Sequence, residues 1–327
     1  MQAILNYFLN KNFLTKSIQS DIDFYNELSD EFLLEAYNDA FVRLFKRVYR
    51  HSPFYRNWYK NHGIGENSIK DITDIQRLPE IDKHILSESS YPIQNGHHLL
   101  RKKGNTSGTT GSPFTTYRTP LSMMTEKAYI HQYREMHGFK QGEAILSIRG
   151  ALGKNTLNYK DSLSNTLYIS GPNLNDSNIR AFYKLIIDFK PKAIEAFPSY
   201  LHRFVQLLEK HKLLLRIPLT FTSSEMLYDF QRKEAETYLQ TKIYDWYGNV
   251  ERTIALAQDK SNHYKPLPLY SINEYKENEI VTTGLNNYYY PLIRYKVDDT
   301  IQTKTNDFFK NIVCLLYTSD AADDTPC

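Results

Sequence analysis

A run of hydroxyl residues and glycines from Asn105 to Pro113, Asn-Thr-Ser-Gly-Thr-Thr-Gly-Ser-Pro, constrains this chain more than any other stretch. Its glycines permit positive φ angles and leave room for a ligand to touch the backbone. Consecutive main-chain N–H groups in such a loop form a concave anion site, and the hydroxyls add further donors. The run therefore predicts a phosphate-binding loop, with a flexible surface loop of the same composition as the alternative.

The run is not a phosphate loop of the Walker type. Gly111 is followed by Ser112 and Pro113, where that motif has Lys and then Ser or Thr. A kinase or GTPase built on the Walker motif is therefore not expected.

Helical and strand patterns alternate after this run. Apolar residues over 121–137 recur mostly at helical spacing, and the apolar segment 144–148 is typical of a short buried strand. Further strands are expected at 193–197, 217–222 and 242–246, with helices at 179–189, 201–208 and 227–239. Pro198 and Ser199 offer a start for the second of these helices, with Ser199 as its N-cap. Strand, helix, strand, helix predicts a layered α/β fold with sheets flanked by helices.

The segment before the run is expected to be mainly helical. Residues 24–62 carry one apolar stripe at three- and four-residue spacing, and Pro53 is expected to end that helix. The later segment Leu78-Pro79-Glu80-Ile81-Asp82-Lys83 is interpreted as a connection between helices, with a structural role only.

The bulk composition excludes several classes of protein. Forty basic residues against 37 acidic ones leave a formal charge of +3, too balanced for a nucleic-acid-binding surface. No window approaches the roughly 18 consecutive apolar residues of a membrane span. Cys314 and Cys327 cannot form a disulfide framework, which suits a reducing compartment. We therefore expect a cytoplasmic protein with neither a nucleic-acid partner nor a membrane span.

Small polar residues follow the strand expected at 217–222. Ser223 and Ser224 precede Glu225, and the next helix begins shortly afterwards. Open α/β sheets bind ligands at the carboxyl ends of their strands, so this turn is a candidate ligand contact. Helix capping by one of the serines is the alternative, and both roles can hold together.

The strand expected at 242–246 leads into Tyr247-Gly248-Asn249-Val250-Glu251. Alone, such a segment is usually a strand-to-turn junction. It indicates a ligand site only because it follows the phosphate-binding run in the sequence. His97 and His98, by contrast, are expected to be a surface pair, because a hydrolase metal site would need further ligands.

Taken in order from about residue 24 to residue 313, these motifs resemble those of the adenylate-forming superfamily. The branch they resemble is that of phenylacetate-CoA ligases and CapK-type proteins, the latter associated with capsular polysaccharide loci. A final motif supports the resemblance, since Tyr290-Pro291-Leu292-Ile293-Arg294-Tyr295 leads to Asp299. Without the resemblance, residues 293–297 are interpreted as a half-buried strand that ends in a turn. In that superfamily the terminal Asp of the corresponding motif binds the ribose hydroxyls.

The resemblance implies a set of site residues. The phosphates of ATP would contact Thr106, Ser107, Gly108, Thr109, Thr110 and Gly111, with Thr106, Thr109 and Glu251 as catalytic residues. Adenine would lie against Ser223, Ser224, Glu225, Tyr247 and Gly248, and the ribose would bind Asp299. Glu251 would also hold Mg²⁺. The sequence departs from the family pattern at Phe114, Val250, Val297 and Asp298, where relatives have Lys, a hydroxyl residue, Thr and Gly.

The resemblance also implies a division of the chain. Residues 1–90 are expected to be the helical N-terminal part of the large domain and 91–313 its nucleotide-binding core. Residues 314–327 resemble translated read-through of a sequencing adapter, so we expect a non-native tail and no small C-terminal domain. A chain without that domain would have low activity.

The function that follows is ATP-dependent activation of a carboxylic acid as an acyl-adenylate. Transfer to CoA or another acceptor would come next, in a phenylacetate-CoA ligase-like or polysaccharide-forming reaction. The alternative is a catalytically degenerate nucleotide-binding accessory protein of polysaccharide assembly, which the departures at Phe114, Val250 and Asp298 would suit.

Overall fold

The structure is a computed structural model that describes residues 13–96, 100–105, 115–153, 155–276, 279–303 and 313–316. Residues 106–113 of the run predicted to bind phosphate lie outside the described residues, as do Phe114, His97, His98 and the chain beyond residue 316. Within the described part of the chain, no helix is both long enough and apolar enough to span a membrane.

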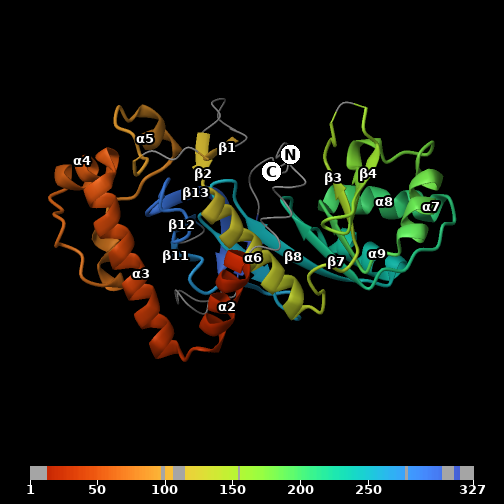
Figure 1. The fold of residues 1–327 in the computed structure, drawn as a ribbon, viewed down its shortest axis with the longest axis horizontal. Helices are drawn as coiled ribbons and strands as arrows, with labels where there is room; N and C mark the ends of the chain where they lie inside the picture. The colour runs from red at the N-terminus through yellow and green to blue at the C-terminus, as the bar shows by residue number, and fades with distance from the viewer. Residues whose placement is uncertain are drawn as a thin grey trace.

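The N-terminal part is helical (Figure 1, red to orange). It contains α2 (Phe13–Glu27), α3 (Asp30–His51), α4 (Pro53–Asn61), the 3-10 helix η1 (Ile72–Arg77) and α5 (Lys83–Glu88). Helix α3 ends just before Pro53, as predicted, but Pro53 then begins α4, where its missing N–H costs nothing. Ser52 joins the two helices, because its hydroxyl accepts from the Tyr55 amide at 3.4 Å and donates to the Ile93 carbonyl at 2.8 Å.

Twelve strands of the described chain form one mixed sheet in the order β11-β12-β13-β14-β10-β9-β8-β7-β6-β3-β5-β4. One half is mainly parallel: β3 (Ile145–Arg149), β5 (Thr166–Ser170), β6 (Ala193–Ala196), β7 (Leu219–Ser223) and β8 (Lys242–Gly248), with antiparallel β4 (Asn158–Asp161) at its edge. The other half is antiparallel: β9 (Ala255–Gln258), β10 (Tyr264–Pro266), β11 (Ser271–Lys276), β12 (Glu279–Gly284), β13 (Tyr295–Thr303) and β14 (Val313–Leu316). A separate hairpin, β1 (Lys102–Asn105) and β2 (Thr115–Arg118), flanks the loop 106–114.

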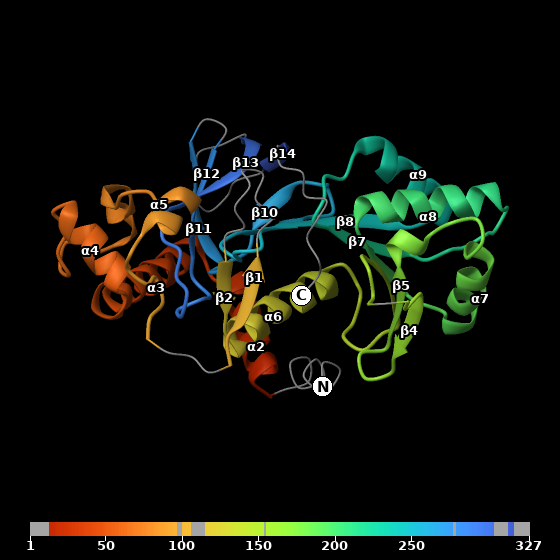
Figure 2. The ribbon, with the colours of Figure 1, turned by 90° about the horizontal axis from the view of Figure 1, so that it is seen from above.

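Helices cover both faces of the parallel half. Helices α7 (Ile179–Phe189), α8 (Pro198–Lys210) and α9 (Asp229–Leu239) pack on one face around an apolar core. Helix α6 (Pro120–Met136), with α2 beside it, lies on the opposite face (Figure 2). The predicted layered α/β fold is confirmed, and the sheet places α6 over strands β3, β6, β7 and β8.

Arg294, which forms a buried ion pair within the antiparallel half, also joins this half to the N-terminal part of the chain. The Arg294 guanidinium donates to both carboxylate oxygens of Glu274 at 2.8 Å, and the two residues are 4% and 3% exposed. The same guanidinium donates to the Leu78 carbonyl. The amide of Ile81 donates to the Arg294 carbonyl at 2.9 Å. The segment from Leu78 to Lys83 is therefore attached to the sheet, in line with its predicted structural role.

Two local predictions were wrong. The N-cap of α8 is Phe197 instead of Ser199, because Pro198 takes the first helical position and the Glu225 carboxylate accepts from the Ser199 amide at 2.8 Å. The strand at 293–297 was expected to end in a turn, yet β13 starts at Tyr295 and runs through Asp299 to Thr303. Pairing with β12 and β14 keeps this segment extended.

Candidate functional site

Two predicted contacts lie at the carboxyl ends of neighbouring parallel strands. Ser223 is the last residue of β7, and Gly248 is the last residue of β8. Ser224 follows with a left-handed φ of 72°, and its hydroxyl lies 3.5 Å from that of Ser223. Glu225 accepts from both the amide and the hydroxyl of Ser199, at 2.8 and 2.9 Å. The turn after β7 is therefore fixed by the N-terminus of α8.

Four of the motif residues meet next to this sheet edge. The Tyr247 hydroxyl donates to Oδ2 of Asp299 at 2.7 Å, and the ring of Tyr247 is 1% exposed. The Tyr295 hydroxyl donates to Oε1 of Glu251 at 2.9 Å. Strand β8 and the loop after it thus contact β13 through two tyrosine–carboxylate hydrogen bonds. This arrangement joins the motif around residue 250 to the motif around residue 295.

The loop after β8 holds Glu251 through its neighbours. Oδ1 of Asn249 accepts from the Thr253 amide at 2.9 Å, and Nδ2 of Asn249 donates to the Thr253 hydroxyl at 2.8 Å. The Arg118 guanidinium donates to the carbonyl of Val250. At Gly248 a Cβ would lie 3.0 Å from the indole nitrogen of Trp246, so a larger residue would disturb the entry to this loop.

The electrostatics of the site centre on Lys83. Its ammonium lies 2.7 Å from Oδ2 of Asp298, an exposed carboxylate. Burial alone would lower the pKa of Lys83, but the bond to Asp298 and the charge of Glu251 raise it above its usual value. Burial raises the pKa of Glu251, and Lys83 opposes that rise. The site therefore pairs one lysine with carboxylates from the loop after β8 and from β13.

Sequence analysis missed two members of this site. Lys83 was interpreted as structural, although its side chain reaches Asp298 across more than 200 positions of sequence. Tyr295 had no assigned role, yet its hydroxyl contacts Glu251. For Tyr295 the available signal was its place in the final motif, whereas Lys83 lies in a segment that was interpreted only as a structural connection. The predicted residues Thr106 to Gly111 lie outside the described residues.

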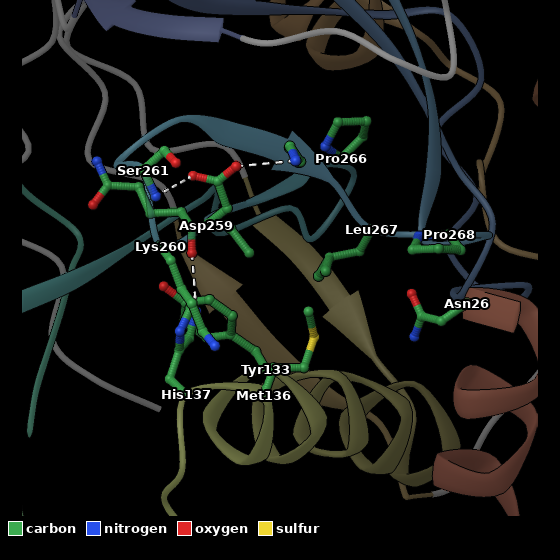
Figure 3. Close-up of a pocket in the computed structure, with 13 residues that line it drawn as sticks. Asn26, Tyr133, Met136, His137, Asp259, Lys260, Ser261, Pro266, Leu267 and Pro268 are labelled. Carbon is green, nitrogen blue, oxygen red and sulfur yellow. Dashed lines mark hydrogen bonds and ion pairs between the residues drawn. The ribbon is translucent and has the colours of Figure 1, made fainter.

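A cavity of about 410 Å³ lies elsewhere, between the end of α6 and the segment after β9 (Figure 3). Met136, Leu267 and Pro268 are among its lining residues. His137 is buried at its edge, its Nε2 lies 3.0 Å from a main-chain carbonyl, and burial lowers its pKa. Of the predicted site residues that the structure describes, none lines this cavity, so it is separate from the candidate site.

Known proteins support the family expected from the motifs. No family model matches the chain. The chain is 24% identical over 316 residues to Protein CapK of Staphylococcus aureus, in an alignment that covers 92% of this chain and 70% of CapK.

Solved structures give the same result for the fold. An open conformation of 2-hydroxyisobutyryl-CoA ligase, in complex with 2-HIB-AMP and CoA, matches with a TM-score of 0.67 and 17% identity, over 86% of this chain and 68% of the ligase. The ligase in its postadenylation state, in complex with R3-HIB-AMP, matches with a TM-score of 0.65 and 17% identity, over 86% of this chain and 66% of the ligase. The chain thus spans about two thirds of these ligase chains. The expected resemblance is confirmed: the chain is similar in sequence to CapK over most of its length and shares its fold with 2-hydroxyisobutyryl-CoA ligase.

Proposed function

We propose that this chain binds ATP and a carboxylic acid at the carboxyl ends of β7 and β8 and activates the acid as an acyl-adenylate. The observation that carries the proposal is the hydrogen bond from Tyr247 to Asp299, beside the buried carboxylate of Glu251. Two motifs that are distant in sequence meet there, in the order expected for adenylate-forming proteins. The similarity to CapK and the fold shared with a ligase that binds an acyl-AMP and CoA support the same function.

The reaction needs no covalent nucleophile from the protein. An oxygen of the substrate carboxylate attacks the α-phosphorus of ATP, the bond to the β-phosphate oxygen breaks, and pyrophosphate leaves. The predicted loop 106–111 would supply amide and hydroxyl donors to the departing phosphates, with Thr106 and Thr109 as its proposed catalytic residues. Asp299 would accept from the ribose hydroxyls. The buried Tyr247 ring would have to be uncovered before adenine could stack on it.

The residues present fit a magnesium ion in part. Mg²⁺ is usually held by one or two carboxylates together with substrate phosphates, and Glu251 supplies one such carboxylate. Among the described residues, no group of three or more His, Cys, Asp or Glu side chains could hold a metal by itself. Any Mg²⁺ here would therefore depend on the nucleotide, with Glu251 as the protein ligand. When bound, it would neutralise charge on the phosphates.

The acceptor of the activated acid is CoA or another nucleophile in this proposal. A thioester product would follow the 2-hydroxyisobutyryl-CoA ligase, and an acceptor in polysaccharide assembly would follow the association of CapK-type proteins with capsule loci. A phenylacetate-like acid is one candidate substrate.

Calorimetry with AMP and with ATP and Mg²⁺ tests the binding step, and pyrophosphate release across a panel of carboxylic acids tests the chemistry. Binding together with acid-dependent pyrophosphate release supports the proposal. Binding without release from any acid would favour the nucleotide-binding accessory protein. Absence of nucleotide binding would refute both functions.

A further inference from the structure

A small cavity of about 200 Å³ lies between α6 and the sheet face formed by β3, β5 and β6. Helix α6 contributes Lys127, His131 and Arg134, which are four and three positions apart and so share one face of the helix. The strands contribute Arg149 and Glu195. The volume is below the roughly 300–1,000 Å³ of sites for drug-sized ligands, which favours a small occupant.

The charge of the lining is strongly positive. Its four basic side chains, Lys127, Arg134, Arg149 and Arg252, face two carboxylates, and one of these, Glu143, is already paired with Lys192 outside the lining.

The other carboxylate, Glu195, is also occupied. Its oxygens lie 3.0 Å from Arg134 and 3.4 Å from Arg149. Although burial raises the pKa of Glu195, these two arginines hold it at about 2. Burial lowers the pKa of His131 to about 4, so this ring is neutral at pH 7. One ionised carboxylate therefore pairs with two arginines, and the net charge of the cavity lining is positive.

Lys127 is one of the cations that line this cavity. Burial, followed by the charge of Arg149, lowers the pKa of its ammonium to about 8. Arg252 and Lys102 act in the same direction, and Glu195 opposes them. Holding several cations together in a half-buried space costs stability, and such groups concentrate at functional sites. An anion in the cavity would relieve the repulsion.

The cavity reaches the candidate site through Arg252. This residue follows Glu251 directly and has a left-handed φ of 56°. Its amide donates to the Asn249 carbonyl at 3.0 Å. Its Nη1 is buried and makes no hydrogen bond within the described part of the chain. A substrate that entered the cavity would thus lie one residue from the proposed metal ligand.

We propose that this cavity binds the end of the acid substrate remote from the reacting carboxylate, and that this end carries a second negative charge. The inference rests on the proposed function, because it assigns the substrate class of that reaction. Lys127 and Arg252 would contact the second anionic group, while Glu195 keeps Arg134 and Arg149 in position. A small dicarboxylic acid, or an acid with a phosphonate or phosphate group at its far end, has this chemistry.

Four acids that carry different terminal groups on the same two methylene groups test the inference: succinate, 3-phosphonopropionate, butyrate and 3-aminopropanoate. Their binding to the full chain, saturated with AMP, is measured by calorimetry. We expect one or both acids with two anionic groups to bind at least tenfold more tightly than butyrate, and 3-aminopropanoate to bind most weakly. Butyrate binding as tightly as both of these would overturn the inference. Failure of AMP itself to bind would instead refute the proposed function.

Two variants and a control separate ligand contact from a structural role. Lys127→Met and Arg252→Gln should each reduce the preference for the doubly anionic acid at least fivefold, whereas Lys184→Met, at an exposed position of α7, should leave it unchanged. At pH 8, binding of the preferred acid should also take up as much as about half a proton in the wild type and none in Lys127→Met. This uptake is measured in two buffers with different ionisation enthalpies. Equal preference and equal uptake in the wild type and Lys127→Met would contradict the role of Lys127.

Discussion

Replacement of Lys127 by methionine should stabilise the protein at pH 7. The folded chain lowers the pKa of this ammonium from 10.5 to about 8, and each unit corresponds to about 1.36 kcal/mol. The shift of about 2.5 units therefore costs the folded state about 3 kcal/mol while the lysine is charged in both states. Partial exposure of the side chain to solvent reduces this, so we expect Lys127→Met to raise the free energy of unfolding by about 2–3 kcal/mol at pH 7.

The pH dependence gives this prediction its sign. The unfolded chain binds more protons at Lys127 than the folded chain between about pH 8 and pH 10.5, so wild-type stability gains from this group as the pH rises through that window. The advantage of Lys127→Met should therefore fall to less than half by pH 9.5. The free energy of unfolding of the wild type is subtracted from that of the variant at each pH. The contributions of the ionisable groups that the two proteins share cancel in this difference.

Urea denaturation at pH 7, 8, 9 and 9.5 measures the effect, because the denaturation midpoint and slope give the free energy of unfolding. Lys184→Met is the control, and it should stay within about 0.5 kcal/mol of the wild type at every pH. A Lys127→Met variant that is less stable than the wild type would refute the reasoning, as would an advantage that does not change between pH 7 and 9.5. Either result would mean that the charge is well solvated or well paired in the folded protein.

Three further predictions concern the candidate site and the core beside it. Asp299→Ala should weaken AMP binding by about 1.5–3 kcal/mol in calorimetry, which is the range for hydrogen bonds to a charged group. Asp298→Ala should weaken AMP binding less. A larger loss in Asp298→Ala than in Asp299→Ala would move the ribose contact by one residue. Glu251→Gln should keep the circular dichroism spectrum of the wild type and lose most Mg²⁺-dependent pyrophosphate release, and unchanged release would contradict the metal role. Burial raises the pKa of Asp245 to about 6, so the stability that this group confers is complete below about pH 4 and is lost as the pH rises through 6. The free energy of unfolding should change by about 3 kcal/mol over this range. Urea denaturation at pH 4, 5, 6 and 7 measures the change, which Asp245→Asn should abolish.

The helices and strands of this chain could largely be predicted because their patterns are local. The helix expected at 121–137 is α6, Pro120–Met136, and the strand expected at 242–246 is β8, Lys242–Gly248. The prediction failed at Asp298 and Asp299, which are typical turn residues. Their backbone lies in β13 because the neighbouring strands pair with it, and pairing partners cannot be read from a single segment.

The candidate site was only partly predictable for the same reason. The motifs supplied Tyr247, Glu251 and Asp299, but the hydrogen bond between Tyr247 and Asp299 depends on β8 and β13 reaching the same edge of the sheet. Lys83 belongs to a segment whose sequence indicates only a connection between elements. Its position at Asp298 follows from the attachment of that segment to Arg294, and hence from a buried ion pair in another part of the sheet.

The charged cavity could not be predicted from residue patterns, because a charged helix face normally lies in water. Lys127, His131 and Arg134 would be assigned to solvent on α6, yet they face a sheet whose strand β6 has Glu195 among apolar neighbours. Stability does not explain this arrangement, since well-packed apolar residues in place of buried ion pairs often stabilise a fold. The folded chain keeps an excess of positive charge next to the proposed nucleotide site, where burial lowers the pKa of Lys127. The free energy of binding an anionic substrate would offset the free energy that this positive charge costs in folding. Substrate binding therefore accounts for both the sign and the position of the excess charge.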